Sequence, residues 1–204
     1  MALPQAKLYI SPEDYLAFER QSDERHEYDN GRIYAMAGES LSHSRININV
    51  AREVSGFLKG KRCEALSLNM KVAVTKAGKY FYPDLSVVCD EPLFYDHRRD
   101  VLLNPTVVIE VLSPSTEKTD LSEKQVYYLQ IASLTDYIII AQDRPLVRHY
   151  TRHDDGQWLF SIINDLTQSV TIKSLDFTLS LADIYDRIEF EPLPELESDP
   201  ERLV

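Results

Sequence analysis

The sequence predicts an α/β or α+β protein in which a mixed β-sheet is flanked by helices. Two observations carry this prediction. Short apolar runs typical of buried strands alternate with segments that have the 3.6-residue period of amphipathic helices. Two tight-turn signals, Asn30-Gly31 and Asp155-Gly156, each lie between strand-like runs and predict β-hairpins added to the sheet.

Helix signals stand out in the N-terminal half of the chain. Ser11 can cap a helix and Pro12 suits its first turn, so we expect a helix from Ser11 to about Arg20. A longer helix is expected over residues 40–59, because apolar residues recur there at helical spacing and Gly60 can end it. Strands are expected on both sides of the Asn30-Gly31 turn and at residues 64–68 and 70–75.

Strand signals dominate the rest of the chain. Two apolar runs, residues 84–89 and 106–112, predict neighbouring strands joined by a polar loop. Residues 119–132 have helical periodicity, and the very apolar run 136–141 predicts a central strand. The last expected elements are a hairpin over residues 146–152 and 157–163 and a short helix over residues 181–186, capped by Ser180.

Length and charge limit the classes of protein. The 204 residues fit one domain, which we place at residues 1–188, followed by an acidic and mobile tail at residues 189–204. The net charge is −11, of which the tail contributes −5 from six acids and one arginine, so the remainder is still −6. This balance counts against tight non-specific binding of nucleic acid, which normally requires a basic surface.

Targeting and redox signals point to the cytoplasm. The chain has no apolar run of about 18 residues, and its N-terminus lacks the apolar core of a secretory signal, so we expect no membrane association. Cys63 and Cys89 show no metal-ligand spacing and are predicted to be reduced core residues. His149 and His153 alternate along the second predicted hairpin and are expected to face solvent.

Two carboxylates form the strongest candidate for a chemical site. Glu110 lies inside the apolar run 106–112, and Asp84 opens the apolar run before it. A carboxylate is costly to bury unless it is paired or binds a metal. Mg²⁺ prefers one or two carboxylates together with waters and phosphate oxygens, and the backbone carbonyl of Val111 could add a further ligand. The ordinary alternative is a turn aspartate and a glutamate paired with a core arginine.

A lysine completes this candidate site. Lys124 lies on the helical stripe that also holds Leu121, Tyr128 and Ile131, where an apolar residue is expected. Its ammonium either reaches water past an apolar stem, with Asp120 as an ion-pair partner, or lies near the metal. In the second case it orients or deprotonates a water and offsets charge on a reacting phosphate. Two acids and a lysine around a metal indicate hydrolysis of a phosphodiester.

Other polar residues are candidates for supporting roles. Ser113 belongs to a hydroxyl-rich segment between strand and helix that either caps the helix or contacts a phosphate. His43, in the first turn of the longer predicted helix, and Glu27, just before the Asn30-Gly31 turn, are each either an extra ligand or general base, or a structural hydrogen-bonding residue.

Taken together, these motifs resemble the PD-(D/E)xK nuclease superfamily, whose fold is restriction-endonuclease-like, and within it a bacterial family of proposed endonucleases called Uma-two. The resemblance covers roughly residues 10–188. It rests on Glu27-Tyr28 with Gly31, Met36-Ala37-Gly38 with His43, Tyr82-Pro83-Asp84, the string Val108-Ile109-Glu110-Val111-Leu112-Ser113-Pro114-Ser115-Thr116, and Asp120, Lys124 and Tyr128. Leu112 stands where the superfamily usually has lysine, and the family pattern maps that lysine onto Lys124.

The resemblance implies Mg²⁺-dependent cleavage of DNA, with Mn²⁺ as a substitute. Asp84, Glu110 and Lys124 would be catalytic, and Asp84, Glu110 and Val111 would bind the metal. Two alternatives stay open: a nuclease-fold protein without activity that serves as a binding or regulatory module, and hydrolysis of a small phosphodiester or nucleotide. A homodimer is compatible with double-strand cutting, by analogy alone.

Overall fold

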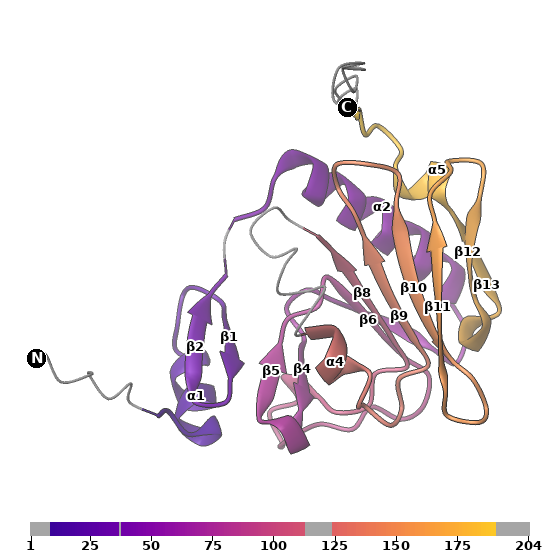
Figure 1. Ribbon diagram of the computed structural model, residues 1–204. Helices are drawn as coiled ribbons and strands as arrows, with labels where there is room; N and C mark the ends of the chain where they lie inside the picture. Colours follow the sequence, from indigo (N-terminus) through magenta and orange to yellow (C-terminus); the bar gives the residue numbers. More distant parts are fainter. Residues whose placement is uncertain (1–8, 37, 113–123, 191–204) are drawn as a thin grey trace, which may run out of the picture.

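A computed structural model describes residues 9–36, 38–112 and 124–190 of the chain (Figure 1). The described helices are α1 (Pro12–Glu19), α2 (Leu41–Leu58), α4 (Gln125–Tyr128) and α5 (Leu181–Ile184), with short 3-10 turns η1 (Thr75–Ala77) and η3 (Lys173–Leu175). The described strands are β1 (His26–Asp29), β2 (Arg32–Ala35), β3 (Glu64–Ser67), β4 (Lys71–Val74), β5 (Lys79–Phe81), β6 (Leu85–Val88), β7 (Val101–Leu102), β8 (Val107–Val111), β9 (Asp136–Ile140), β10 (Val147–Arg152), β11 (Trp158–Ile163), β12 (Ser169–Ile172) and β13 (Phe177–Ser180).

The main sheet is mixed, as the sequence predicts. Its strand order is β11-β10-β9-β8-β6-β3. β8 and β9 run parallel, and the other neighbours in this sheet are antiparallel. The run of isoleucines in β9 lies between β8 and β10 and is buried throughout, which confirms the predicted central strand.

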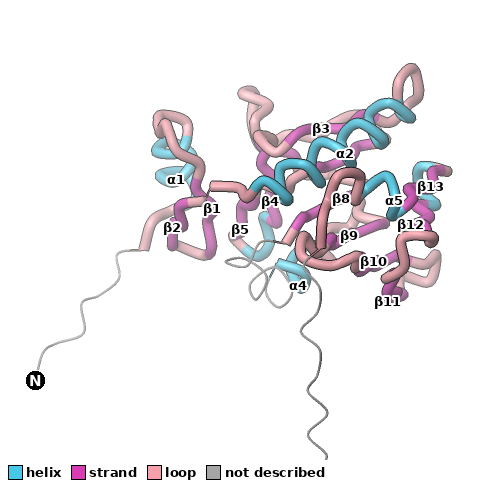
Figure 2. Tube along the Cα trace, turned by 90° about the horizontal axis from the view of Figure 1, so that it is seen from above, coloured by secondary structure: helices cyan, strands magenta, loops and turns pink. Residues whose placement is uncertain are grey.

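The two faces of this sheet support separate apolar cores. Val107, Ile109 and Val111 of β8 belong to the core that contains the apolar residues of α2 and α5. Val108 and Leu112 point to the opposite face and pack with Tyr128 of α4. Figures 1 and 2 show α2 and α4 on opposite sides of the sheet. Glu110 shares the α4 face with Val108 and Leu112, because side chains alternate along a strand.

A second sheet, of order β2-β1-β5-β4-β7, brings the N-terminal hairpin to the α4 side of the molecule. The predicted Asn30-Gly31 turn is confirmed: both residues have positive φ, 40° and 91°, as a two-residue hairpin turn requires. β1 pairs with β5, so Tyr28 lies opposite Tyr80 and the preceding residue, Glu27, lies close to the chain that leads into Pro83-Asp84.

Charged contacts attach α1 to the loop before β7. Arg20 forms a forked interaction with Asp100, with Nε–Oδ2 at 2.9 Å and Nη2–Oδ1 at 2.7 Å, and also contacts Asp96 at 2.8 Å. The buried Lys71 approaches Asp100 from β4, at 3.3 Å. The hydrogen bonds from Arg20, together with the nearby Lys71 charge, lower the pKa of Asp100 to about 2.

Several elements differ from the sequence-based predictions. β5, β7, β12 and β13 were not expected, since each is four residues or shorter and lacks a long alternating pattern. The helix predicted over residues 119–132 ends at Tyr128, where hydrogen bonds of the 3-10 type continue to Ile131. Its predicted N-terminal part and most of the acidic tail predicted at residues 189–204 lie outside the described residues.

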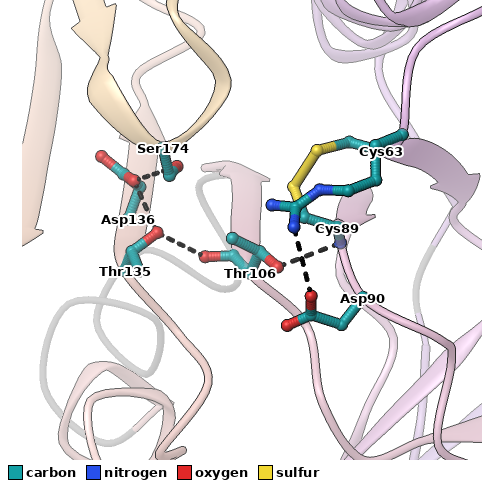
Figure 3. The surroundings of a disulfide bond; sticks show 8 residues. Cys63, Cys89, Asp90, Thr106, Thr135, Asp136 and Ser174 are labelled. Carbon is teal, nitrogen blue, oxygen red and sulfur yellow. Dashed lines mark hydrogen bonds and ion pairs between the residues drawn. A yellow bond between two sulfur atoms is a disulfide. The ribbon is translucent and has the colours of Figure 1, made fainter.

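The two cysteines form a disulfide, so the prediction of reduced cysteines is wrong (Figure 3). The reason is strand register: Glu64 of β3 pairs with Val88 of β6, which places the flanking Cys63 and Cys89 opposite one another. Cys89 is 26 residues from its partner, and its amide donates to Thr106 Oγ1 at 3.2 Å. The sequence gives no sign of this contact, because the contact depends on how the two strands pair.

His149 is the second correction. It is buried, and its Nε2 lies 2.8 Å from Asp136 Oδ1 and 3.1 Å from the hydroxyl of Thr151. Asp136, at the start of β9, also accepts hydrogen bonds from Thr135 and Ser174 (Figure 3). The carboxylate makes burial of the imidazole favourable, whereas His153 is exposed as expected.

None of the described helices has the length and hydropathy that crossing a membrane requires.

Candidate active site

Asp84 lies at the end of the main sheet, directly before β6, and links β8 to α2. Leu85 pairs with Ile109, so Asp84 is one step further along, next to Glu110 and Val111. Its Oδ2 accepts a 2.6 Å hydrogen bond from the amide of Val111. Its Oδ1 interacts with two side chains of α2, Nε2 of His43 at 3.1 Å and Nδ2 of Asn47 at 2.9 Å.

Glu110 occupies the fourth position of β8 and is only 4% exposed. Its Oε1 accepts a 3.0 Å hydrogen bond from the hydroxyl of Tyr128, in α4. Burial, reinforced by the nearby Glu110 charge, raises the pKa of Tyr128 well above its usual value. The phenol therefore stays protonated and remains a donor to Glu110 at every working pH.

Lys124 is buried at the start of α4 and lies between two carboxylates. Its Nζ is 2.7 Å from Oε1 of Glu27 and 4.0 Å from Oε1 of Glu110. Glu27 Oε1 also accepts from the amide of Tyr82, two residues before Asp84, at 3.3 Å. The lysine is 6% exposed, so its ammonium does not reach past an apolar stem to water. It points toward the acids, and the hairpin strand β1 supplies Glu27 as a partner.

The oxygen atoms of Asp84 decide where a cation fits. Among the described residues, Oδ1 has two hydrogen-bonding partners and Oδ2 has one. A carboxylate oxygen offers about two lone-pair sites, so Oδ2 retains one. That oxygen lies on the side of Val111 and Glu110. The donor set of two carboxylates and a nearby backbone carbonyl suits a hard cation such as Mg²⁺.

A second donor set shares Asp84. Ligand atoms of Glu39, His43 and Asp84 all lie within 4.8 Å of one another. Glu39 precedes α2, whose N-terminus is capped by the hydroxyl of Ser40 through a 3.1 Å bond from the His43 amide. This cap fixes the first turn and so directs His43 toward Asp84.

The structure thus brings together most of the residues singled out from the sequence. His43, Asp84 and Val111 form one hydrogen-bonded set, and Glu27, Lys124 and Glu110 form a set of charged contacts. The two sets meet where Glu110 precedes Val111 in β8. Ser113 and Asp120 lie outside the described residues. Sequence reasoning missed the contacts of Asn47 and Glu39. Asn47 follows His43 by four residues, and two polar residues at that spacing on one helix face were the available signal.

A mixed sheet that carries two acids at the ends of adjacent strands, with a lysine on the following helix, defines a restriction-endonuclease-like protein. A solved structure agrees with this class: a protein from Anabaena variabilis described as "a putative nuclease belonging to DUF820" matches with a TM-score of 0.72. The match covers 86% of this chain and 97% of that chain at 20% identity, so it shows a shared fold.

The sequence comparisons identify the family. Residues 12–182 match the Uma2 family, described as "Putative restriction endonuclease". The chain is also 34% identical over 183 residues to the uncharacterized protein slr1290 of Synechocystis, covering 89% of this chain and 94% of the relative. A second Synechocystis protein, sll1609, is 32% identical over 152 residues, which cover 74% of this chain and 86% of the relative. The chain belongs to the Uma2 family.

Proposed function

We propose that this protein is a Mg²⁺-dependent endonuclease that hydrolyses phosphodiester bonds in DNA. The observation that carries the proposal is the meeting of Asp84, Glu110 and Lys124 at one end of the main sheet. The family supports a nuclease-like function, and the chemistry of the side chains supports the reaction. A homodimer with two such sites would cut both strands of a duplex.

Asp84 and Glu110, with the carbonyl of Val111, would hold the ion. When bound, Mg²⁺ supplies a positive charge that polarises a phosphoryl oxygen and lowers the pKa of a water. Tyr128 holds Glu110 in place through the buried hydrogen bond, and His43 with Asn47 holds Asp84. A carboxylate that is already oriented loses little conformational freedom on binding a cation.

Lys124 would act on the attacking water and on the phosphate. It lies 4.0 Å from Glu110 without a direct contact of hydrogen-bond length, and Glu27 orients it from the other side. A fixed ammonium of this kind offsets negative charge that develops on the phosphate in the transition state. Glu27 therefore has a positioning role in the proposal.

The test is a cleavage assay with Mg²⁺ or Mn²⁺ on supercoiled, linear duplex and single-stranded DNA, comparing wild type with Asp84→Ala. We expect cleavage by wild type that requires metal and disappears in the variant. Equal cleavage by Asp84→Ala would overturn the assignment. Absence of cleavage by wild type on every substrate would favour the inactive binding module, and turnover of a small phosphodiester alone would favour the small-substrate hydrolase.

A cytoplasmic location is part of the proposal, because it would give the protein access to DNA. The Cys63–Cys89 disulfide counts against it, since disulfides are uncommon in a reducing cytoplasm. Thiol labelling of freshly lysed cells measures whether the two cysteines are reduced. Reduced cysteines would support the cytoplasmic location, and a disulfide would count against it.

A further inference from the structure

The outer strand of the N-terminal hairpin carries an exposed tyrosine beside the candidate active site. Tyr34 lies in β2, the edge strand of the second sheet, and is 47% exposed. It pairs directly with Glu27 of β1, and Glu27 contacts Lys124 at 2.7 Å. Paired residues of antiparallel strands have Cβ atoms about 4.5–5.5 Å apart. The side chain of Tyr34 therefore starts next to Glu27, at the border of the candidate site.

Strand alternation decides to which side of the hairpin Tyr34 points. Ile33 packs in the apolar cluster that contains Tyr15 of α1. Successive side chains of a strand point to opposite sides, so Arg32 and Tyr34 point away from α1. Glu27 lies on the same side as its partner Tyr34, and its contact with Lys124 shows that this side faces the candidate site. Figure 1 shows β2 as the outer strand of the hairpin, with β1 between it and β5.

The charges on this side of the hairpin leave Arg32 available for an anion. Both acids of β1 that point there have a lysine partner: Asp29 pairs with Lys79, and Glu27 pairs with Lys124. Arg32 is exposed, and within the described residues no ion pair involves it. The other two acids of the site are those assigned to the metal. The hairpin thus presents one positive charge in excess, two residues from the exposed tyrosine ring.

A tyrosine ring and a guanidinium group together suit a nucleotide. The face of an aromatic ring stacks on a nucleobase, and the fork of an arginine donates two parallel hydrogen bonds to a phosphate. Arg32 and Tyr34 are two residues apart on one strand, or about 6.8 Å at ~3.4 Å per residue. One nucleotide can therefore place its base on the ring and its phosphate on the guanidinium.

The ring selects a nucleotide whose base is unpaired. Within a duplex the faces of each base are covered by its neighbours, so Tyr34 can stack only on a base that has left the stack. The net charge of −11 agrees with this choice. Tight binding of a duplex through its phosphates requires a basic surface, whereas stacking on an aromatic ring does not depend on the charge of the protein.

We propose that Tyr34 and Arg32 form a subsite that holds an unpaired nucleotide of DNA beside the scissile phosphate. The proposal rests on the endonuclease function proposed above and adds the class of substrate: single-stranded DNA, or a duplex with unpaired nucleotides such as a flap or a gap. Every base has a face that stacks, so the subsite accepts any base.

The first experiment measures binding of a labelled single-stranded oligonucleotide and of its duplex, in EDTA to prevent cleavage. Wild type is compared with Tyr34→Ala, with Tyr34→Phe, which keeps the ring, and with Phe18→Ala. Phe18 is also 47% exposed but lies on α1, on the other side of the hairpin. We expect Tyr34→Ala to bind the single strand about tenfold more weakly and the duplex as wild type does. Tyr34→Phe and Phe18→Ala should bind both as wild type does.

The salt dependence of single-strand binding tests Arg32 separately. In Arg32→Gln, the plot of log affinity against log salt should be flatter by about 0.7, the value for one lost phosphate contact on a single strand. Tyr34→Ala should keep the slope of wild type, because stacking releases no counterions. Arg62→Gln is the matched control, since its side chain is 74% exposed and lies outside the hairpin, and it should also keep the slope.

Each contrary result overturns the subsite: equal losses in Tyr34→Ala and Phe18→Ala, equal losses on single strand and duplex, loss of binding in Tyr34→Phe, or no single-strand binding by wild type. The two proposals fail separately. Binding of single strands that depends on Tyr34, in a protein that never cleaves, overturns the endonuclease alone. Metal-dependent cleavage with a single-strand affinity that Tyr34→Ala leaves unchanged overturns the subsite alone.

Discussion

Asp84 accepts a hydrogen bond from the backbone amide of Val111, with 2.6 Å between Oδ2 and N. This bond continues the pairing of β6 and β8 by one residue, with the side chain of Asp84 as the acceptor. It places the Asp84 carboxylate beside Glu110, although the two acids are 26 positions apart in the sequence. The first prediction depends on this proximity.

Divalent metal should stabilise the folded protein through Asp84. A ligand at 100 times its dissociation constant adds about 2.7 kcal/mol to the free energy of unfolding, if it binds only the folded state. We therefore expect Mg²⁺ or Mn²⁺ to raise the melting temperature of wild type by several degrees and to leave that of Asp84→Asn unchanged. Differential scanning fluorimetry measures both. An equal shift in the two proteins would place the metal elsewhere.

Removing the Lys124 ammonium should affect both activity and stability. Lys124→Met keeps the stem volume but leaves Glu27 without its 2.7 Å partner. We expect cleavage to fall by about 10²-fold, the scale for one electrostatic stabiliser. We also expect the unfolding free energy to fall by about 3 kcal/mol, because one partner of a buried pair is lost.

The double variant Lys124→Met/Glu27→Gln separates these two effects. It should recover part of the lost stability, since Glu27 no longer leaves an unpaired charge, and it should remain inactive. Urea unfolding and single-turnover cleavage are the measurements. Recovery of cleavage in the double variant would show that Lys124 serves only to neutralise Glu27.

Tyr128→Phe should disturb Glu110 while keeping the apolar packing of α4. The buried hydroxyl donates to Glu110 at 3.0 Å, and the raised pKa of Tyr128 keeps that proton in place. Loss of one hydrogen bond to a charged group costs about 1.5–3 kcal/mol. We expect a lower unfolding free energy and weaker metal binding by calorimetry. A variant with unchanged metal affinity would mean that Tyr128 has no part in orienting the carboxylate.

Acid should remove a stabilising contribution from Asp100. Its pKa is lowered from 3.8 to about 2, chiefly by hydrogen bonds from Arg20. The unfolded state therefore binds more protons between these two values, so the contribution is complete above pH 4–5 and is lost as the pH falls toward 2. After screening, we expect it to be about 1 kcal/mol. Wild type should exceed Asp100→Asn in urea stability at pH 6, and the difference should shrink at pH 2.5.

Reduction of the Cys63–Cys89 disulfide should lower stability without touching the candidate site. A closed loop of 26 residues contributes about 3 kcal/mol through the restricted unfolded chain. We expect Cys63→Ser/Cys89→Ser to match reduced wild type in urea unfolding. Oxidised wild type should be more stable than both. Identical curves for oxidised and reduced protein would show that the crosslink leaves the unfolding equilibrium unchanged.

Local patterns in the chain were sufficient for many elements of the fold. Ser11 with Pro12, and Asn30 with Gly31, act through their own backbone and nearest neighbours, so the first helix and hairpin are readable from sequence. The strand that carries Glu110 is readable for the same reason, since an acid within a long apolar run is conspicuous. Lys124 is conspicuous in the same way, because it stands on a helical stripe where an apolar residue is expected.

Pairings between distant segments were not readable. Cys63 meets Cys89, and His149 meets Asp136, only because of strand register, and the sequence suggested reduced thiols and an exposed imidazole. Short strands such as β7 exist because a neighbouring strand offers hydrogen bonds, and their own propensity is insufficient.

Local sequence patterns were therefore enough to predict the chemical groups, the mixed sheet, and the places of Asp84 at the start of one strand and Glu110 within another. The tertiary structure alone decided which partners these groups have: Val111, His43 and Asn47 for Asp84, Tyr128 for Glu110, and Glu27 for Lys124. The physical reason is that secondary structure follows from interactions within a few residues, whereas burial and electrostatic pairing depend on contacts between segments that only folding brings together.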